Sequence, residues 1–517
     1  MTSLRTARVG GLATDVCLPG GAGSFPAVLI RTPYDRSRHL AEARGWARRG
    51  FAAVVQDVRG RFASPGEWRP YENEAADGAA TARWLRRQPW SDGRYVAVGA
   101  SYAAHCALAL SLDVSGEARP DAVIAAVPAL GAAETAREPS GVERLLARAG
   151  WWAAHGDRCD SDEGALEQAL AADPGLLTHL PLATLPERLG RSLPSWAGLW
   201  RHRERGRLAF RAAHADVPLL VVGGHHDHFT EDTVALWRTW GGPSAHLLLG
   251  PWGHGLVSAP GPDAGPAHRV VLGELYAEWA RRALTGGLAP GRHGALALGG
   301  GDLWMPPGTE GEPRTQPLRL LHGSRFTADP DSPVRSDDLT VPTGGVPDRC
   351  LLVSPPLPRP LDAVGPVRLR LRATADTPSA DWAARLVALT PDGTAERLAV
   401  GVLRREEPAD RQAEFTAERR LAVGAPPRKE PANRHPEFTV ELGRLARRLR
   451  AGTRLRLEIA GHHFPAHARN PHTGDDPITV DRLLASRREV DPASVTLTLH
   501  VLPTRPTSTD PAKEILR

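Results

Sequence analysis

The stretch that decides the fold reads Tyr95-Val96-Ala97-Val98-Gly99-Ala100-Ser101-Tyr102-Ala103-Ala104-His105. An apolar run ends at Gly99, Ser101 follows after one small residue, and further small residues lead into a second apolar segment. This pattern predicts a strand, a sharp turn and a helix, with the serine hydroxyl held clear of the sheet at the start of the helix. The motif alone leaves two interpretations open, a nucleophile or an ordinary strand-to-helix turn.

Two later segments supply the partners that a serine nucleophile needs. An apolar run over residues 217–224 is predicted to be a strand, with Asp227 just past its end, and a second run stops at Gly250 before His254. Residues beyond the carboxyl ends of parallel strands gather at one sheet edge, so Ser101, Asp227 and His254 are expected to converge. His254 would then take the serine proton and Asp227 would fix its tautomer.

Simpler interpretations stand beside these. Asp227 would also suit a turn or a helix cap, and His254 a solvated loop. The run His225-His226-Asp227-His228 raises the possibility of a metal site. Consecutive residues in a turn point in different directions, however, and no second ligand pair lies at a helical i, i+4 spacing. We therefore expect neither a metal nor another cofactor.

The rest of the chain is predicted to form three parts, of which the first two are an α/β domain and a cap. Strands alternate with helices, which is typical of a doubly wound, mostly parallel sheet; the strands are expected near 27–31, 51–57, 95–98, 122–127, 219–223 and 246–249. A long insertion with four tryptophans, Trp151, Trp152, Trp196 and Trp200, reads as a cap over the strand ends. These side chains would line an acyl pocket or simply hold a small helical unit together.

Beyond the helix expected at 270–284, the pattern changes. Residues 286–317 are rich in glycine and proline and suggest a linker or a loop-rich edge. Strict alternation over 367–372, 455–459 and 495–501 then predicts an antiparallel β-sandwich, and the polar tail from Arg505 is expected to fray. The predicted boundaries are 1–130 and 214–315 for the two parts of the α/β domain, 131–213 for the cap and 316–517 for the sandwich.

Several motifs occur together in one order. They are Arg31-Thr32-Pro33-Tyr34, the loop Gln56-Asp57-Val58-Arg59-Gly60 with Ser64 and Gly66, the serine turn, Gly224-x-x-Asp227-x-Phe229, and Gly250-Pro251-Trp252-Gly253-His254. In these the sequence resembles the cocaine-esterase and X-Pro dipeptidyl-peptidase family of serine hydrolases. One departure is Ala104, where the family's serine turn has glycine, which is expected to crowd the helix slightly against the sheet.

The resemblance implies an α/β fold: an α/β-hydrolase domain with a helical cap insertion and a C-terminal jelly-roll β-sandwich. It implies Ser101 as nucleophile, His254 as base and Asp227 as its orienting group. The oxyanion hole would be the backbone N–H of Tyr102 together with the Tyr34 hydroxyl, a neutral donor at pH 7. By the same resemblance Phe229 lines the acyl pocket, and the cap residues Trp151 and Trp152 are candidates for binding substrate.

Composition and charge limit the classes of partner and the location that we expect for the protein. The chain has 517 residues, 41% of them hydrophobic, and a net charge of +5, which is ordinary for a globular protein. No apolar run approaches the length of a membrane span, the start lacks a signal core, and the four cysteines are scattered, so a cytoplasmic protein is expected. Arg444 to Arg450 form the densest basic stretch, which would bind phosphate or lie on a solvated structural face. We expect no nucleic acid and no membrane as partner, and no motif in the sequence indicates a particular oligomeric state.

The sequence thus predicts a serine hydrolase acting on a small-molecule ester or amide through an acyl-enzyme. One alternative is an X-Pro dipeptidyl aminopeptidase, for which Glu134, Glu138 and Glu143 in the cap are candidate anchors for a substrate amine. Others are an acyltransferase or cyclase using the same three residues, and a catalytically silent ligand-binding protein with a lectin-like sandwich.

Overall fold

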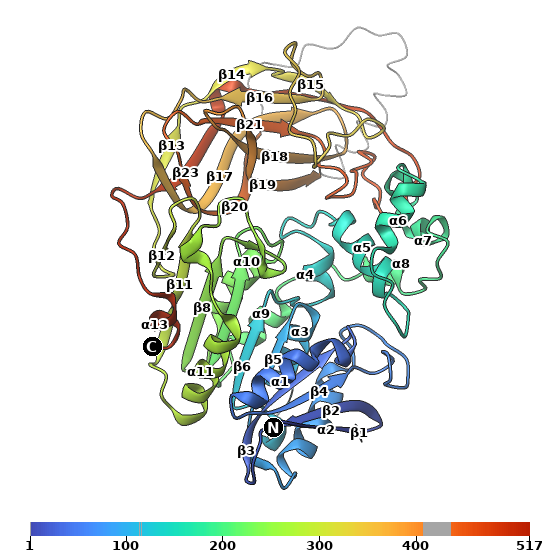
Figure 1. Ribbon diagram of the computed structural model, residues 1–517. Coiled ribbons are helices and arrows are strands. Elements are labelled where there is room, and N and C mark those ends of the chain that lie inside the picture. Colours follow the sequence, from blue (N-terminus) through green and yellow to red (C-terminus); the bar gives the residue numbers. More distant parts are fainter. Residues whose placement is uncertain (1, 113, 115, 407–435) are drawn as a thin grey trace.

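The computed structural model describes residues 2–112, 114, 116–406 and 436–517. A ten-stranded sheet forms the lower part of the molecule in Figure 1. Its order is β1 (Ser3–Val9), β2 (Leu12–Leu18), β4 (Ala52–Asp57), β3 (Phe25–Thr32), β5 (Ser91–Ala100), β6 (Ala122–Ala126), β7 (Leu219–Gly224), β8 (Ser244–Gly250), β11 (Gly291–Leu298) and β12 (Leu303–Met305). The pairs from β4 to β11 are parallel, whereas β1, β2 and β12 join by antiparallel pairing. The predicted, mostly parallel sheet is confirmed.

Helices cover both faces of this sheet because its strands are apolar on both sides. Ala27 and Leu29 of β3 belong to one core, and Val28 and Ile30 to the other, as the two-residue period of a strand requires. The first core is closed by α2 (Glu74–Arg86), α3 (Tyr102–Leu112), α9 (Arg207–Ala212) and α10 (Thr230–Thr239). The second is closed by α1 (Leu40–Arg48), α11 (Leu272–Thr285) and α13 (Pro511–Ile515).

The insertion after β6 forms a small helical unit beside the sandwich (Figure 1). It contains α4 (Ala132–Ala136), α5 (Leu145–His155), α6 (Ala165–Ala172), α7 (Leu185–Arg188) and α8 (Trp196–Leu199). Trp152, Trp196 and Trp200 lie in its apolar core, which also receives Phe464 and Ile478 from loops of the sandwich. The cap is therefore packed against the C-terminal domain. α9, inside the predicted cap range, instead contributes its apolar side chains to the sheet core.

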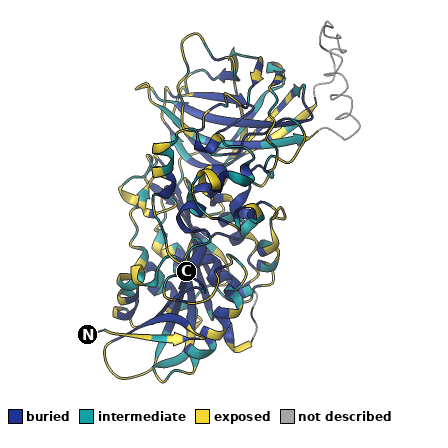
Figure 2. Cartoon of the chain, turned by 90° about the vertical axis from the view of Figure 1, so that its right-hand side faces the viewer, coloured by how far each residue is buried: buried dark blue, intermediate teal, exposed yellow. Residues whose placement is uncertain are grey.

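The C-terminal domain is a sandwich of two sheets, at the top of Figure 1, whose strand pairs are all antiparallel within the described ranges. One sheet has the order β13 (Glu312–Gln316), β23 (Thr496–Val501), β17 (Leu361–Ala375), β22 (Ser486–Val490) and β15 (Arg325–Ala328), with β20 (Glu437–Leu449) also on β17. The other has the order β14 (Arg319–His322), β16 (Arg349–Val353), β21 (Arg454–Ala460), β18 (Ser379–Leu389) and β19 (Ala395–Glu406). Residues of both sheets form one buried apolar core, and much of their ribbon is dark blue in Figure 2, which confirms the predicted sandwich.

Two expectations from the sequence are wrong. Residues 286–317 are not merely a linker, since they supply β11 and β12 to the main sheet. Gly294 has a φ of 139°, and a Cβ there would lie 2.0 Å from the carbonyl oxygen of Leu247, so this glycine permits a strand rather than ending one. The tail does not fray after Arg505 either. Asp510 caps α13, and Ile515 is fully buried in the second core.

The basic stretch Arg444–Arg450 lies at and just after the end of β20, and three of its four arginines are paired with carboxylates. Arg444 pairs with Glu310, Arg447 with Asp263 and Glu396, and Arg448 with Asp362. These pairs agree with a structural face rather than a phosphate-binding patch. Among the residues described, no helix has the length and apolarity that a membrane span requires.

Candidate active site

The turn that carries Ser101 joins β5 to α3. Ser101 has a φ of 57°, and its N–H donates to the Ala126 carbonyl at 2.9 Å. A Cβ on Gly99 would lie 2.1 Å from the carbonyl oxygen of Ala103, so only glycine allows the helix to pass this close to the strand. Ala104, the departure from the family's glycine, lies in α3 and is fully buried. The backbone thus holds the serine in a left-handed conformation above the sheet edge.

His254 lies between Ser101 and Asp227. Its Nε2 is 3.0 Å from Ser101 Oγ, and its Nδ1 is 2.9 Å from Asp227 Oδ1. His254 follows the short strand β9 (Trp252–Gly253), which pairs with β10 (Leu256–Pro260), and Asp227 lies in the turn between β7 and α10. Three residues from distant segments are therefore within hydrogen-bonding distance in series.

The Asp227 side chain is fully buried, and its charge is held in place by two imidazoles. Burial alone would raise its pKa, but the hydrogen bond from His254, the electrostatic interactions with the His228 and His254 rings and the Phe229 backbone N–H together outweigh burial and lower the pKa. The carboxylate therefore stays ionised at neutral pH. An ionised acceptor at Nδ1 fixes the proton on that nitrogen and leaves Nε2 free to accept a proton from Ser101.

The Tyr34 hydroxyl lies beside the serine turn. It accepts a hydrogen bond from the indole N–H of Trp151 at 3.1 Å and is within reach of the Ser101 side chain and the Tyr102 backbone. Burial raises its pKa to about 12, so the phenol keeps its proton at neutral pH and can donate it. The first backbone N–H of α3, at Tyr102, faces the same point, as expected at a helix N-terminus.

Tyr102 has a second, structural role that the sequence did not reveal. Its hydroxyl donates to Glu74 Oε1 at 2.5 Å and accepts from the Tyr71 N–H at 2.8 Å. Glu74 is buried, and burial raises its pKa. These contacts lock the first residue of α3. Nothing in the local sequence around Tyr71 and Glu74 indicates these contacts, because Tyr71 lies in a loop and Glu74 at the start of α2, both about 30 residues before Tyr102 in the sequence.

The predicted pocket residues are placed unequally. The ring of Phe229 is buried with its centroid 5.6 Å from that of His254. Trp151 stacks on Tyr102, with ring centroids 6.0 Å apart and 15° between the planes, and remains partly exposed. Trp152, in contrast, is buried in the core of the cap. Trp151 therefore contacts the oxyanion-hole candidate Tyr102 and Phe229 contacts His254, whereas Trp152 packs inside the cap.

His228 is the neighbour that sequence reasoning placed only in a possible metal cluster. Its Nδ1 lies 3.2 Å from Asp227 Oδ1, and its ring stacks on His254 with centroids 5.1 Å apart. Burial lowers its pKa to about 4. Asp227, His228 and His254 bring their ligand atoms within 4.8 Å of one another. The other two histidines of the run point elsewhere, His226 to Asp263 and His225 to the Ala297 carbonyl.

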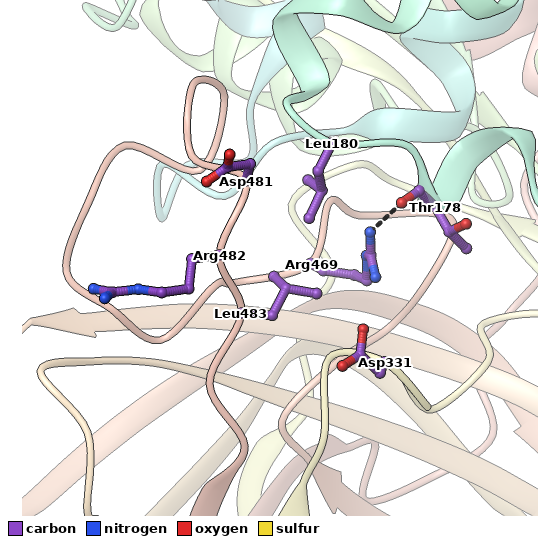
Figure 3. Close-up of a pocket in the computed structure, with 7 residues that line it drawn as sticks. All are labelled: Thr178, Leu180, Asp331, Arg469, Asp481, Arg482 and Leu483. Atoms are coloured by element: carbon purple, nitrogen blue, oxygen red, sulfur yellow. Dashed lines mark hydrogen bonds between the residues drawn. The ribbon is translucent and has the colours of Figure 1, made fainter. Parts of the chain in front are cut away.

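A hollow of about 480 Å³ lies elsewhere, between the cap and the sandwich (Figure 3). It is lined by Thr178, Leu180, Asp331, Arg469, Asp481, Arg482 and Leu483. Arg469 is engaged there by the carbonyls of Thr178 and Pro330. None of the residues around Ser101 lines this hollow, so it is separate from the candidate site.

The fold combines an α/β core that carries a serine turn with a helical cap and a β-sandwich. This combination defines the class of the protein, which is a serine hydrolase of the α/β-hydrolase type. The model of X-Pro dipeptidyl-peptidase (S15 family) matches residues 11–256, and that of the X-Pro dipeptidyl-peptidase C-terminal non-catalytic domain matches residues 317–509. Together the two matches cover most of the sequence. The chain belongs to the S15 family of cocaine-esterase and X-Pro dipeptidyl-peptidase relatives.

Individual relatives agree with this assignment. Cocaine esterase from Rhodococcus sp. is 27% identical over 288 residues, which is 49% of this chain and 48% of that protein, so the match spans about half of the curated relative. Two solved structures share the fold over 97% of this chain: an aminopeptidase from a marine-sediment Thaumarchaeota archaeon, with TM-score 0.75 and 18% identity, and an α-amino acid ester hydrolase, with TM-score 0.74 and 17% identity. They cover 96% of those chains.

Proposed function

We propose that the protein hydrolyses a small-molecule ester or amide through an acyl-enzyme on Ser101. The observation that carries the proposal is the chain of hydrogen bonds from Ser101 Oγ through His254 to the buried Asp227 carboxylate. His254 Nε2 takes the hydroxyl proton while Oγ attacks the carbonyl carbon, and the carbon–oxygen double bond becomes a single bond to an oxyanion.

In this proposal the oxyanion is held by the Tyr34 hydroxyl and the Tyr102 backbone N–H. Both donors are fixed before substrate arrives, Tyr34 by Trp151 and Tyr102 by its position at the start of α3. Preorganised donors of this kind need no reorganisation as negative charge develops, and the loss of one costs about 2.7–4 kcal/mol of barrier. The intermediate then expels an alcohol or amine, which takes the proton from His254, and water releases the acid by the same steps.

An X-Pro dipeptidyl aminopeptidase activity is less well supported, because the three candidate acidic anchors for a substrate amine already bind groups of the protein itself. Glu138 is bound by Arg144 and His467, and Glu143 by Arg137 and Arg404. Glu134 accepts the Gly206 N–H at 2.7 Å. A comparison of a 4-nitrophenyl ester with an X-Pro 4-nitroanilide separates the two activities. Faster cleavage of the anilide would overturn the esterase proposal.

A fluorophosphonate probe tests the nucleophile itself. We expect the intact protein to be labelled once, and Ser101→Ala to lose the label without a change in melting temperature. Ser258→Ala is a matched control, since that serine lies near the site but bonds only the Gly255 carbonyl among its side-chain contacts. Equal labelling of Ser101→Ala and the parent would place the nucleophile elsewhere. Absence of any label would instead favour a silent binding protein.

Hydroxylamine added during ester cleavage separates hydrolysis from acyl transfer, since a transferase forms mainly the hydroxamate.

A further inference from the structure

One arginine near the candidate site has no acidic partner. Arg148 lies on α5, one turn before Trp151 and Trp152, and is only 4% exposed. Its Nε and Nη2 are buried and have no hydrogen-bond acceptor. Across the described residues no carboxylate forms an ion pair with it. An unmatched buried charge is costly, so its presence calls for an explanation.

The two unpaired atoms form the edge with which guanidinium groups hold carboxylates. Arg144 donates Nε and Nη2 to Glu138 at 2.9 and 2.8 Å, and Arg404 donates the same two atoms to Asp381 at 2.8 and 2.9 Å. This parallel pair of N–H groups matches the two oxygens of a carboxylate. In Arg148 the same edge is preserved and buried, but the carboxylate is missing.

Arg148 faces the aromatic wall of the Ser101 site. Its guanidinium carbon lies 5.3 Å from the centre of the Trp151 ring, and the Trp151 indole N–H is bonded to the Tyr34 hydroxyl. Burial lowers the pKa of Arg148, and the charge of Arg144 adds to the lowering. A hydrogen bond with the Tyr71 hydroxyl and the electrostatic interactions with Tyr71 and Tyr34 act in the opposite direction, but they supply no negative charge at neutral pH. Three neighbours of Arg148, namely Tyr34, Tyr71 and Trp151, are partly exposed, so Arg148 lies directly behind side chains that reach solvent beside Ser101.

We propose that Arg148 is the anchor for a carboxylate on the substrate, so that the enzyme acts on half-esters or half-amides of short dicarboxylic acids. The proposal rests on the function assigned above to Ser101 and adds the class of substrate. The substrate supplies the two oxygens that the fold withholds. Charge-assisted hydrogen bonds in a dry site are strong and directional, and an ester without the second carboxyl group would leave the guanidinium unmatched.

The unmodified enzyme provides the first test. The substrates are mono-(4-nitrophenyl) glutarate and its methyl ester, which have the same reacting carbonyl and differ by the free carboxylate. We expect kcat/KM to be at least about 10-fold higher for the carboxylate, mainly through a lower KM. Equal values, or preference for the methyl ester, would overturn the anchor while leaving the hydrolase intact. Failure to cleave either ester would count against the proposed function instead.

Variants then assign the preference to one side chain. In Arg148→Met the ratio of kcat/KM for the two esters is expected to fall about 10- to 100-fold, and Arg148→Lys should recover part of it because it restores charge without the fork. Arg201→Met removes an exposed cation from the same cap and should leave the ratio unchanged. An unchanged ratio in Arg148→Met, with both rates reduced alike, would show that Arg148 only supports Trp151 and Tyr34. If Arg148→Met does not fold, the comparison on the unmodified enzyme still decides.

Discussion

Replacing Tyr34 with phenylalanine removes one oxygen from the site. The hydroxyl is the proposed donor to the oxyanion, and in the resting enzyme it accepts the indole N–H of Trp151 at 3.1 Å. Loss of an oxyanion donor costs about 2.7–4 kcal/mol of barrier, which corresponds to about a 10²- to 10³-fold fall in kcat. KM should change little, since the ground-state carbonyl depends less on this donor.

The same change has a smaller effect on stability. An indole N–H left without its acceptor costs about 1–3 kcal/mol, which would lower the melting temperature by several degrees. The assay is steady-state cleavage of a 4-nitrophenyl ester, with thermal unfolding measured in parallel. Tyr276→Phe is the matched control, because the Tyr276 hydroxyl is buried on α11 and has no hydrogen-bond partner in the structure. A Tyr34→Phe enzyme with kcat within about threefold of the parent would refute the role of Tyr34.

Two further variants have defined expected effects. Asp227→Asn should lower kcat by about 10⁴-fold, because the amide no longer fixes the tautomer of His254. Because folding lowers the pKa of Asp227, its carboxylate stabilises the folded state fully above the unfolded pKa of about 3.9, and this stabilisation is lost as the pH falls through the lower pKa of the folded state. Asp227→Asn should therefore flatten the plot of unfolding free energy against pH in this acidic range. An unchanged plot would contradict this explanation. Ile515→Ala should cost about 2–5 kcal/mol in urea unfolding, since this side chain is fully buried, whereas a loss below 0.5 kcal/mol (about the effect of a surface change) would mean that α13 is dispensable.

The parts of the fold that could be predicted are those with strong local patterns. Continuous apolar runs at 95–98 and 219–223 indicated parallel strands, and strict alternation at 367–372 indicated the sandwich, because these periods follow directly from which faces are buried. Residues 286–317 were misread since glycine was taken as a loop signal. Gly294 instead permits a close strand approach, which only the neighbouring backbone of Leu247 reveals.

The candidate site was predictable to a similar, partial extent. The convergence of Ser101, Asp227 and His254 followed from strand ends at one sheet edge, and their roles remain part of the proposal. Tyr34 came from the family resemblance alone, since a tyrosine after a proline reads locally as a turn residue. Arg148 had no signal at all, because the missing partner of a buried guanidinium can be recognised only once every neighbour has a position.

The most direct measurement of the central claim is to trap the acyl-enzyme. Acid quenching during turnover of a 4-nitrophenyl ester, followed by peptide mass spectrometry, is expected to find the acyl group on the peptide that contains Ser101 and on Ser101 itself. His254→Ala should form this adduct far more slowly. An acyl group on another residue, or one that forms equally fast without the His254 imidazole, would contradict the account.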